Sequence, residues 1–200
     1  MTSSWWLVVP FRWGSAAKSR LVSHTADARQ RLALAFALDA CAAGLAVPAV
    51  EGLIVVGDGP EELLALGAVV VPDPGTGLNA AIAAGARHVP DGAGAVALVS
   101  DLPALRTREL SLALDAAAAD SRCFVSDAEG VGTTALMSRD PLLIDPRFGE
   151  RSRAAHASSG AREIDLPDLP GLHRDVDDEV ALWDALRLGV GIHTSAALAG

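Results

Sequence analysis

The residues best suited to chemistry in this 200-residue chain are one lysine and three carboxylates. Lys18 and Asp101 each follow a short apolar run, and Asp175 and Asp177 stand in HRDVDDE, just before a segment with helical periodicity. An ammonium group can neutralise phosphate oxygens, and carboxylates suit a hard divalent cation that holds phosphates. These residue types therefore predict chemistry on phosphate groups, assisted by a metal ion.

The segment Phe11–Arg20 offers further cations, because Arg12 and Arg20 accompany Lys18 there. Its Gly14–Ala17 stretch keeps the backbone unobstructed for a phosphate group. The spacing of a Walker P-loop, GxxxxGK followed by Ser or Thr, is absent, and so is GxGxxG. We therefore expect a looser phosphate-binding loop, with an ordinary polar loop as the alternative.

The segment PDPGTGLN, Pro72–Asn79, contains glycines that permit backbone conformations and close approaches denied to other residues. Gly77 is the second of them and directly precedes a helical pattern. Asn79 either caps that helix or hydrogen-bonds the edge of a nucleobase, and the sequence leaves both open. Asp101 and Asp177 have a comparable alternative, since an Asp before a helix often serves as its N-cap.

Two later segments combine glycines with hydroxyl groups. In DAEGVGTT, Gly130 and Gly132 are expected to leave backbone N–H groups free to form an anion-binding concavity, to which Thr134 adds a hydroxyl donor. In FGERSR, Gly149 and Ser152 form a similar element at a predicted helix start, flanked by arginines. Helix N-termini attract phosphate groups, so both segments are candidate anion sites.

The composition argues against several classes of function. A net charge of −9 leaves no basic stripe for a nucleic acid backbone, so we expect no nucleic acid partner. Two isolated cysteines and five scattered histidines give no pattern typical of a zinc site or a disulfide framework. No apolar run reaches the roughly 18 residues of a membrane span, and the first residues lack the basic start of a secretory signal. We therefore expect a cytoplasmic protein with no membrane partner.

Short apolar runs alternate with segments of helical periodicity over most of the chain. Strands are predicted at Trp5–Pro10, Gly52–Val56, Ala68–Val71, Ala95–Ser100, Cys123–Ser126 and Thr134–Met137, with a short extended piece at Glu163–Leu166. Helices are predicted at Thr25–Ala43, Pro60–Leu66, Leu78–His88, Arg106–Ala119, Arg151–Ser159 and Glu179–Leu188. Gly44 is expected to end the first helix. The weakly patterned Gly189–Gly200 is expected to be a packed or frayed tail.

Strands that are unbroken apolar runs are typical of a mostly parallel sheet covered on both faces. Right-handed crossovers bring the carboxyl ends of such strands to one edge, where ligands bind in open α/β sheets. We therefore predict a single domain over residues 1–200 with a three-layer α/β/α fold. Lys18, Asp101 and the glycine-containing loops should then meet at that edge.

Six segments, in family order, resemble the phosphoenolpyruvate/2-phospho-L-lactate guanylyltransferases of coenzyme F420 biosynthesis, which have the MobA-like (nucleotide-diphospho-sugar transferase) fold. They span Val8 to Leu182 and read VVPFRWGSAAKSRL, VVPDPGTGLNAAIAAG, ALVSDLPALR, FVSDAEGVGTTAL, FGERSRAAHASSG and LPGLHRDVDDEVAL. The resemblance implies transfer of GMP from GTP to the phosphate of phosphoenolpyruvate or 2-phospho-L-lactate, with release of pyrophosphate and with Mg²⁺ as cofactor. It leaves open whether the protein is a monomer or a homodimer.

The resemblance also implies roles for individual residues. Lys18 matches the lysine that contacts the nucleotide phosphates, and Asp101 and Asp175 match the acidic residues that hold magnesium. Combining it with the loops above, we expect catalysis from Lys18, Asp101 and Asp175; metal binding by Asp101, Asp175 and Asp177; phospho-acid binding by Thr134, Gly149 and Ser152; and nucleotide binding by Arg12, Lys18, Arg20, Gly77 and Asn79.

The sequence departs from the family pattern in three places. Arg12 stands where members often have lysine, Glu150 replaces a small residue or proline, and DVDDEVAL lacks the Thr–Pro that often follows the second aspartate. None of these changes removes a proposed ligand.

Two other functions are weighed against this one. An enzyme of the same fold with a molybdenum-cofactor or sugar-phosphate acceptor usually opens with a glycine-rich loop of the kind LAAGxGxRMG, which is absent here. A non-catalytic nucleotide-binding domain would be expected to have lost Lys18, Asp101 or Asp175. Within the family, 3-phosphoglycerate is a further acceptor, and the sequence does not distinguish guanine from adenine.

Overall fold

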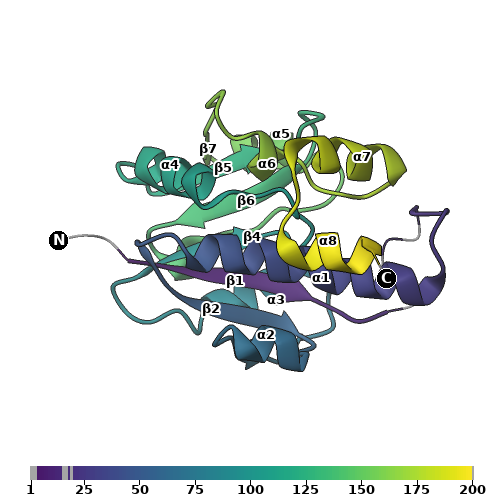
Figure 1. The fold of residues 1–200 in the computed structure, drawn as a ribbon. Helices are drawn as coiled ribbons and strands as arrows, with labels where there is room; N and C mark the ends of the chain where they lie inside the picture. The colour runs from purple at the N-terminus through teal and green to yellow at the C-terminus, as the bar shows by residue number, and fades with distance from the viewer. Residues whose placement is uncertain (1–3, 15–17, 19, 200) are drawn as a thin grey trace.

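The computed structural model describes residues 4–14, 18 and 20–199, and these residues contain one seven-stranded sheet (Figure 1). The six predicted strands are confirmed, with bounds that differ by a few residues. The order across the sheet is β3-β2-β1-β4-β6-β5-β7. The strands are β1 (Trp5–Phe11), β2 (Val50–Gly57), β3 (Val69–Val71), β4 (Gly94–Leu98), β5 (Arg122–Ser126), β6 (Thr133–Ser138) and β7 (Arg162–Glu163).

The direction of β6 matters for the position of the loops. β1 to β4 pair in parallel, whereas β6 runs antiparallel to both β4 and β5. Its first residue, Thr133, therefore lies opposite Ser126, the last residue of β5. Because of this reversal, the start of β6 joins the edge at which the parallel strands end. The predicted mostly parallel sheet is confirmed, and its loops with polar residues share one edge.

Helices cover both faces of the sheet and complete the predicted three layers. α1 (Ala26–Leu45) and α4 (Thr107–Ala117) pack on one face, and α3 (Leu78–Ala86) packs on the other. In Figure 1, α1 crosses in front of the sheet and α3 lies behind it. The remaining helices are α2 (Glu61–Ala65), the 3-10 helix η1 (Pro141–Leu143), α5 (Ser152–Ser158), α6 (Pro170–His173), α7 (Glu179–Leu188) and α8 (Ile192–Ala199).

The apolar strands supply two separate cores because neighbouring side chains point to opposite faces of a strand. Leu7 belongs to the cluster under α1 and α4, and the next residue, Val8, belongs to the cluster under α3. A third cluster joins Phe36 of α1 to Val176 and to Leu182 of α7. This third cluster fixes the segment around Val176, which carries the predicted acidic residues, against α1.

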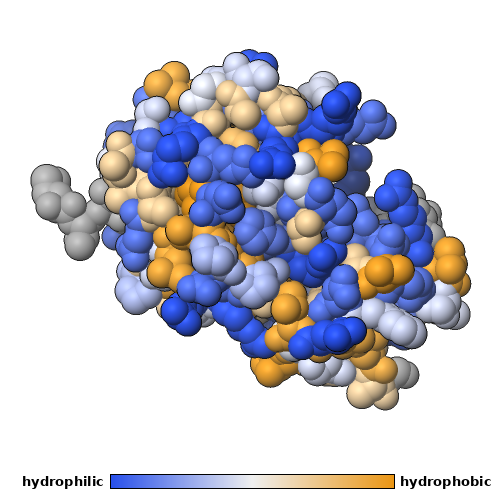
Figure 2. Space-filling view, turned by 90° about the horizontal axis from the view of Figure 1, so that it is seen from above, coloured by the Kyte–Doolittle hydropathy of each residue, from blue (hydrophilic) through white to orange (hydrophobic). Residues whose placement is uncertain are grey.

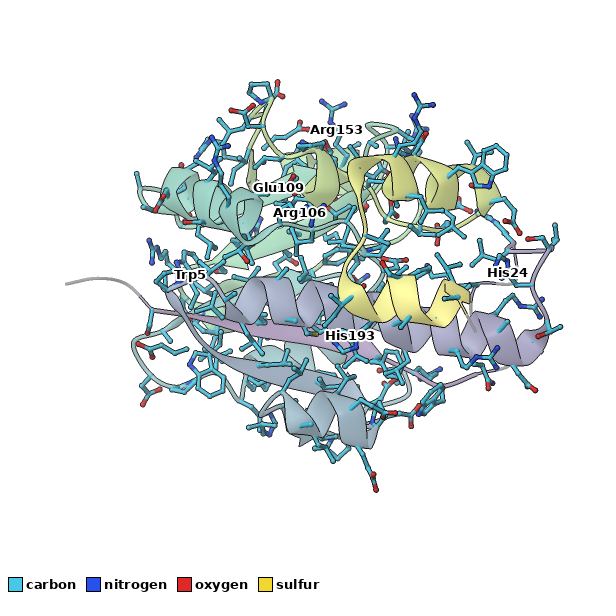
Figure 3. All side chains as sticks on the ribbon, viewed as in Figure 1. Trp5, His24, Arg106, Glu109, Arg153 and His193 are labelled. Carbon is cyan, nitrogen blue, oxygen red and sulfur yellow. The ribbon has the colours of Figure 1, made fainter. Side chains whose placement is uncertain are left out.

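The same segment is held from its other side by the start of α4. The Glu109 carboxylate accepts a hydrogen bond from the backbone N–H of Gly171 (3.1 Å), and the Arg106 guanidinium donates to the carbonyl of Gly189 (2.8 Å). Arg106 and Glu109 lie beside one another in Figure 3, between α4 and the α6–α7 region. Contacts at both ends therefore position the chain from Gly171 to Gly189.

Gly44 does not end the first helix, so that prediction is wrong. α1 continues to Leu45, and Gly44 is buried within it. A Cβ at Gly44 would lie 2.7 Å from Leu7 Cδ1, so the glycine allows close packing of α1 on β1. The sequence does not distinguish a glycine that lets a helix pack closely on a strand from a glycine that ends a helix.

The C-terminal tail is packed and helical. α8 lies against α1, and the buried carboxylate of Asp39 on α1 accepts hydrogen bonds from the backbone N–H groups of His193 (3.0 Å) and Thr194 (2.9 Å). Asp39 therefore caps α8 from another helix, because its carboxylate accepts hydrogen bonds from backbone N–H groups in the first turn. No residue next to α8 in the chain caps its first turn by a pattern that sequence reasoning recognises, and this explains why the helix was not predicted. The short helix α6 was also not predicted.

Figure 2 shows the face that lies uppermost in Figure 1, where hydrophilic residues cover most of the surface and hydrophobic residues form separate groups. Exposed apolar side chains on α7 include Val180 and Trp183. Among the described residues, no helix combines the length and the hydropathy required to cross a membrane.

Replacing Asp39 by Ala should lower the free energy of unfolding by about 1–3 kcal/mol, because two backbone N–H groups lose their acceptor. Asp115→Ala, at an exposed position of α4, is the matched control and should change stability by less than about 0.5 kcal/mol. Urea unfolding followed by circular dichroism measures both. Equal stability of Asp39→Ala and the parent protein would contradict the capping role.

Candidate functional site

Lys18 and two predicted acidic residues are in direct contact. The Lys18 ammonium donates hydrogen bonds to Asp101 Oδ2 and to Asp177 Oδ1, the second at 3.1 Å. The Lys18 side chain is only 13% exposed and that of Asp101 only 18% exposed. The backbone N–H of Val176 donates to the Asp101 carbonyl at 3.0 Å, which aligns the two acidic segments. The predicted meeting of Lys18, Asp101 and the Asp175 segment at one edge is therefore present.

The charges in this cluster do not balance. Burial alone would lower the pKa of Lys18, but Asp101 and Asp177 outweigh that effect and hold the pKa above its usual value. Asp175 forms no salt bridge with any described residue. Burial, with the negative charges of Asp101, Asp177 and Asp127 adding to it, raises the pKa of Asp175 to about 7. The cluster therefore has a carboxylate that a further cation would stabilise.

The carboxylates also fit a divalent cation in a second respect. Asp101 Oδ1 is buried and has no hydrogen-bond partner among the described residues. A buried carboxylate oxygen without a partner is costly unless a cation or donor approaches it. No group of three or more His, Cys, Asp and Glu in the described part of the chain is close enough to hold a metal ion. Mg²⁺ is commonly held by one or two carboxylates together with substrate phosphates, so a closed protein cage is not required.

Asp177 is not the N-cap of the following helix. Asp178 caps α7, because its carboxylate accepts a hydrogen bond from Ala181 N at 2.9 Å. The capping interpretation of Asp177 is therefore wrong, and its carboxylate, 62% exposed, interacts with Lys18 instead. Asp101 does not cap α4 either, since Arg106 is the N-cap there.

The first loop, Phe11–Arg20, follows β1, and the second loop, Pro72–Asn79, follows β3; the contact of Arg12 with Asp73 places them side by side. Arg12 pairs with Asp73 (2.5 Å), and Asp73 also accepts a hydrogen bond from Gly75 N (2.7 Å). The Gly75 hydrogen bond, and then Arg12, lower the pKa of Asp73 below its usual value. Gly77, with φ of +107°, is the N-cap residue that precedes α3. A cavity of about 250 Å³ lies between these loops and is lined by Pro10, Phe11, Arg12, Val56, Asp73, Gly77, Leu78 and Ala81. Its lining combines apolar side chains with one arginine and one aspartate.

Arg20 stands apart from this cavity. Its backbone forms an isolated parallel bridge with Asp178, and the residue is exposed. The bridge ties the end of the first loop to the start of α7. The intervening residues Ser15, Ala16, Ala17 and Ser19, on which the expected unobstructed backbone partly depends, lie outside the described residues.

Asn79 forms a contact that neither sequence interpretation anticipated. Its Oδ1 accepts a hydrogen bond from Phe148 N (2.7 Å), and its Nδ2 donates to Phe148 O (3.0 Å). It does not cap α3, because Gly77 is the N-cap residue and no side chain caps that helix. Both polar atoms of Asn79 are thus engaged with the loop that precedes Gly149.

The predicted anion-binding concavity at Gly130 and Gly132 is wrong. The carboxylate of Asp127 accepts hydrogen bonds from the backbone N–H groups of Val131 (2.8 Å) and Gly132 (2.7 Å). An internal carboxylate therefore uses the donors that a bound anion would need. Thr134, farther along, is buried, and its hydroxyl makes only long contacts, 3.4 Å to the Val125 carbonyl and 3.5 Å to the Ser126 carbonyl.

The other predicted anion element has a more open geometry. Gly149 has φ of +131°, and a Cβ there would meet no atom within 4 Å. Arg151 is the N-cap of α5 in the left-handed region, and Ser152 is the buried first residue of that helix. Backbone groups near Gly149 can therefore face a ligand.

His156 belongs to this region and was not predicted. It is fully buried on α5, its Nε2 accepts a hydrogen bond from Arg147 N (2.9 Å), and its Nδ1 lies 2.9 Å from Thr133 Oγ1. Burial, and then the positive charge of Arg122, lowers the pKa of His156 to about 4. A single histidine in a helical pattern carries no signal that would have distinguished it.

Comparison with known proteins relates this geometry to a family. The model of the MobA-like NTP transferase domain matches residues 27–168. A protein named phosphoenolpyruvate guanylyltransferase from Streptomyces scabiei is 49% identical over 98% of this chain and 96% of its own length. A crystal structure of a putative nucleotide-diphospho-sugar transferase from Desulfovibrio desulfuricans has a TM-score of 0.65 at 21% identity, covering 88% of this chain and 83% of that one. Rv0371c of Mycobacterium tuberculosis in complex with manganese has a TM-score of 0.54 at 22% identity, covering 93% and 97%.

Asp175→Asn should make the protein more stable at neutral and alkaline pH, in the absence of metal. The pKa of this carboxyl rises from 3.8 to about 7 on folding, so the folded protein loses stability as the pH increases from about 4 to about 7. The neutral amide removes that loss, by up to a few kcal/mol at pH 8 and by little at pH 4. Urea unfolding in a chelating buffer between pH 4 and 8 measures the difference, and Asp165→Asn controls for loss of an exposed carboxylate. A difference that does not change with pH would contradict the half-buried, unpaired state of Asp175.

Proposed function

The chain belongs to the phosphoenolpyruvate guanylyltransferase family of MobA-like NTP transferases, and we propose that it transfers GMP from GTP to phosphoenolpyruvate. The observation that carries this proposal is the Lys18 ammonium held between Asp101 and Asp177 at the ligand-binding edge of the sheet. On this proposal residues 1–200 act as one nucleotidyltransferase domain, in the biosynthesis of coenzyme F420. 2-Phospho-L-lactate is the alternative acceptor.

The nucleotide would lie along the first and second loops. The base would occupy the cavity of about 250 Å³ beside Gly77, whose lining combines apolar side chains with Arg12 and Asp73. Arg12 and Arg20 would face the phosphate groups, and Lys18 would exchange a carboxylate partner for a phosphate oxygen. Asn79 contributes to this site through the backbone contact described above, so its predicted role as a direct nucleotide ligand would require it to release Phe148.

The phospho-acid would bind on the other side of the carboxylates. Gly149 offers open backbone, and Thr134 and Ser152 lie at the start of β6 and of α5, which border the same edge. These three residues are the proposed contacts for phosphoenolpyruvate. Its phosphate would then point toward Asp101 and Lys18, where the α-phosphate of the nucleotide also lies.

The reaction follows from that placement. An oxygen of the acceptor phosphate attacks the α-phosphorus of GTP, the new oxygen–phosphorus bond forms, and the bond to the β-phosphate bridge breaks with release of pyrophosphate. The acceptor oxygen is already ionised near neutral pH, so no enzyme base is needed. The work of the protein is to align the two substrates and to neutralise their charge, chiefly through Lys18 and the arginines.

Asp101, Asp175 and Asp177 are the carboxylates from which Mg²⁺ would take one or two ligands, and substrate phosphates would supply others. The ion, when bound, neutralises phosphate charge and orients the reacting groups. The buried, unpartnered Oδ1 of Asp101 and the raised pKa of Asp175 support this donor set, because both favour an added cation. Binding of that cation should lower the pKa of Asp175 and keep it ionised at neutral pH.

The acceptor is identified by offering phosphoenolpyruvate, 2-phospho-L-lactate and 3-phosphoglycerate separately, each with GTP or ATP and Mg²⁺. We expect pyrophosphate release and a guanylylated product, detected by mass spectrometry, to be fastest with GTP and phosphoenolpyruvate. Reactions without acceptor or with chelator are the controls. A faster reaction with a sugar phosphate or with no acceptor would overturn the proposed function.

Asp101→Asn should lower the turnover number by about 100-fold or more, because it removes a charge that holds the metal and orients Lys18. Its circular dichroism spectrum should stay that of the parent protein. Asp115→Asn, an exposed helical position, is the matched control for the same chemical change. Normal guanylyl transfer by Asp101→Asn would exclude Asp101 as a metal ligand.

A further inference from the structure

The loop Arg147–Arg151, here called the acceptor loop, links η1 to α5 and has no regular structure. It contains Gly149, with φ of +131°, and Arg151, with φ of +56°. In a loop without a helix or strand ladder, the backbone N–H and C=O groups must find partners in turns, side chains or water. The identity of those partners determines how firmly Gly149 is held.

Two side chains from other elements bind the first half of the acceptor loop. Asn79 hydrogen-bonds both the N–H and the C=O of Phe148, at 2.7 and 3.0 Å. His156 accepts a hydrogen bond from Arg147 N at 2.9 Å. The second half is held within the loop and α5, where Ser152 N donates to Gly149 O at 3.2 Å. Phe148 is therefore the point at which another layer of the molecule fixes this loop.

The chemistry of Asn79 suits this contact. A primary amide carries one acceptor and one donor side by side, so it can satisfy both polar groups of a single residue, as a neighbouring strand would. Asp could accept from Phe148 N but could not donate to Phe148 O, and Ala could do neither. The two residues are 69 positions apart, and the contact is part-buried.

The position of Asn79 gives the contact a functional consequence. Asn79 is the second residue of α3, directly after Gly77 and Leu78, which line the cavity proposed for the base. Phe148 directly precedes Gly149, a proposed contact of the phospho-acid. The Asn79–Phe148 pair therefore connects the nucleotide side of the site to the acceptor side.

His156 supports the same loop from within the core. Because Nε2 accepts from a backbone N–H, the ring proton lies on Nδ1 and is directed to Thr133 Oγ1. The neutral imidazole is packed near Phe124 and Phe148, with ring centroids 5.6 and 5.1 Å away. It ties the acceptor loop to the start of β6, next to Thr134.

We infer that Asn79 is a positioning residue for the acceptor: it holds the acceptor loop against α3 so that the phospho-acid meets the nucleotide in line. This inference rests on the proposed function, because it assumes that the acceptor loop binds a phospho-acid. It differs from a nucleobase-binding role, in which Asn79 would contact the nucleotide itself.

Steady-state kinetics with GTP and phosphoenolpyruvate test the inference. Asn79→Ala should raise the KM for phosphoenolpyruvate roughly tenfold and lower kcat, while the KM for GTP changes less than about twofold. Asn79→Asp, which keeps the acceptor but loses the donor, should have an intermediate effect. His88→Ala, an exposed position near the end of the same helix, is the control and should match the parent protein.

Two kinetic outcomes would overturn the inference. A rise in the KM for GTP with loss of the preference for GTP over ATP, at unchanged KM for phosphoenolpyruvate, would make Asn79 a nucleotide ligand. Reduced thermal stability with both KM values unchanged would make it only a structural residue.

Hydrogen exchange separates this inference from the proposed function. In the protein without substrates, the amide of Phe148 should exchange at least about tenfold faster in Asn79→Ala than in the parent protein or His88→Ala. Unchanged exchange at Phe148 would overturn the inference whatever the enzyme's substrate. If exchange rises as expected but no phospho-acid is guanylylated, the proposed function is wrong and Asn79 holds the loop for another ligand.

Discussion

The site depends on one half-buried interaction, the Lys18 ammonium between the carboxylates of Asp101 and Asp177. Removing charges from water is expensive, and a buried ion pair often contributes little net stability. Such a cluster is therefore better explained by what it can bind than by what it adds to folding. Its carboxylates outnumber the ammonium, with Asp175 unpaired and its pKa raised to about 7, so the cluster has capacity for another cation.

Much of the fold could be predicted because it depends on local patterns. Unbroken apolar runs predicted the strands, and parallel strands must end at one edge, so Lys18 and Asp101 were expected to meet. Two of the contacts that sequence reasoning missed come from side chains distant in sequence. Asp39 caps a helix about 150 residues later, and Asn79 binds a loop 69 residues away. No periodicity or spacing marks such pairs.

The wrong predictions have a common physical cause. Glycines in DAEGVGTT were expected to free their N–H groups for an anion, but Asp127 in the same segment already supplies the carboxylate. Likewise Gly44 resembled a helix end although it serves packing against Leu7. In each case the sequence correctly indicated that the glycine has a particular structural role. It did not indicate which neighbouring group contacts that glycine. A sequence shows which groups can form a hydrogen bond or a close contact, but not which neighbour forms it with them.

Cavity size is a poor guide to the site in this molecule. One cavity, of about 690 Å³, lies among Arg87, Arg139 and Leu142, at the edge where β5 begins and β6 ends. It is remote from Lys18 and Asp101, and its carboxylate Asp145 is already paired with arginines. The cavity beside Gly77 is smaller, but it borders the first loop, which carries the lysine. The proposed chemistry on phosphate groups requires Lys18 and its carboxylate partners, and these lie at the opposite edge of the sheet.

The loops at that edge hold one another in a closed series of contacts, each between segments far apart in the chain. Each of these loops is thus held by contacts with two neighbouring segments in addition to the contacts within the loop, so a substrate meets an edge that is already arranged. That matters for a reaction whose rate depends on alignment and charge rather than on a reactive side chain. Loss of one contact should therefore first change the position of the loop that the contact holds, as inferred for Asn79 and the acceptor loop. The contacts are Lys18–Asp101, Arg12–Asp73, Asn79–Phe148, Val131–Arg153, Ala128–His173 and Asp101–Val176.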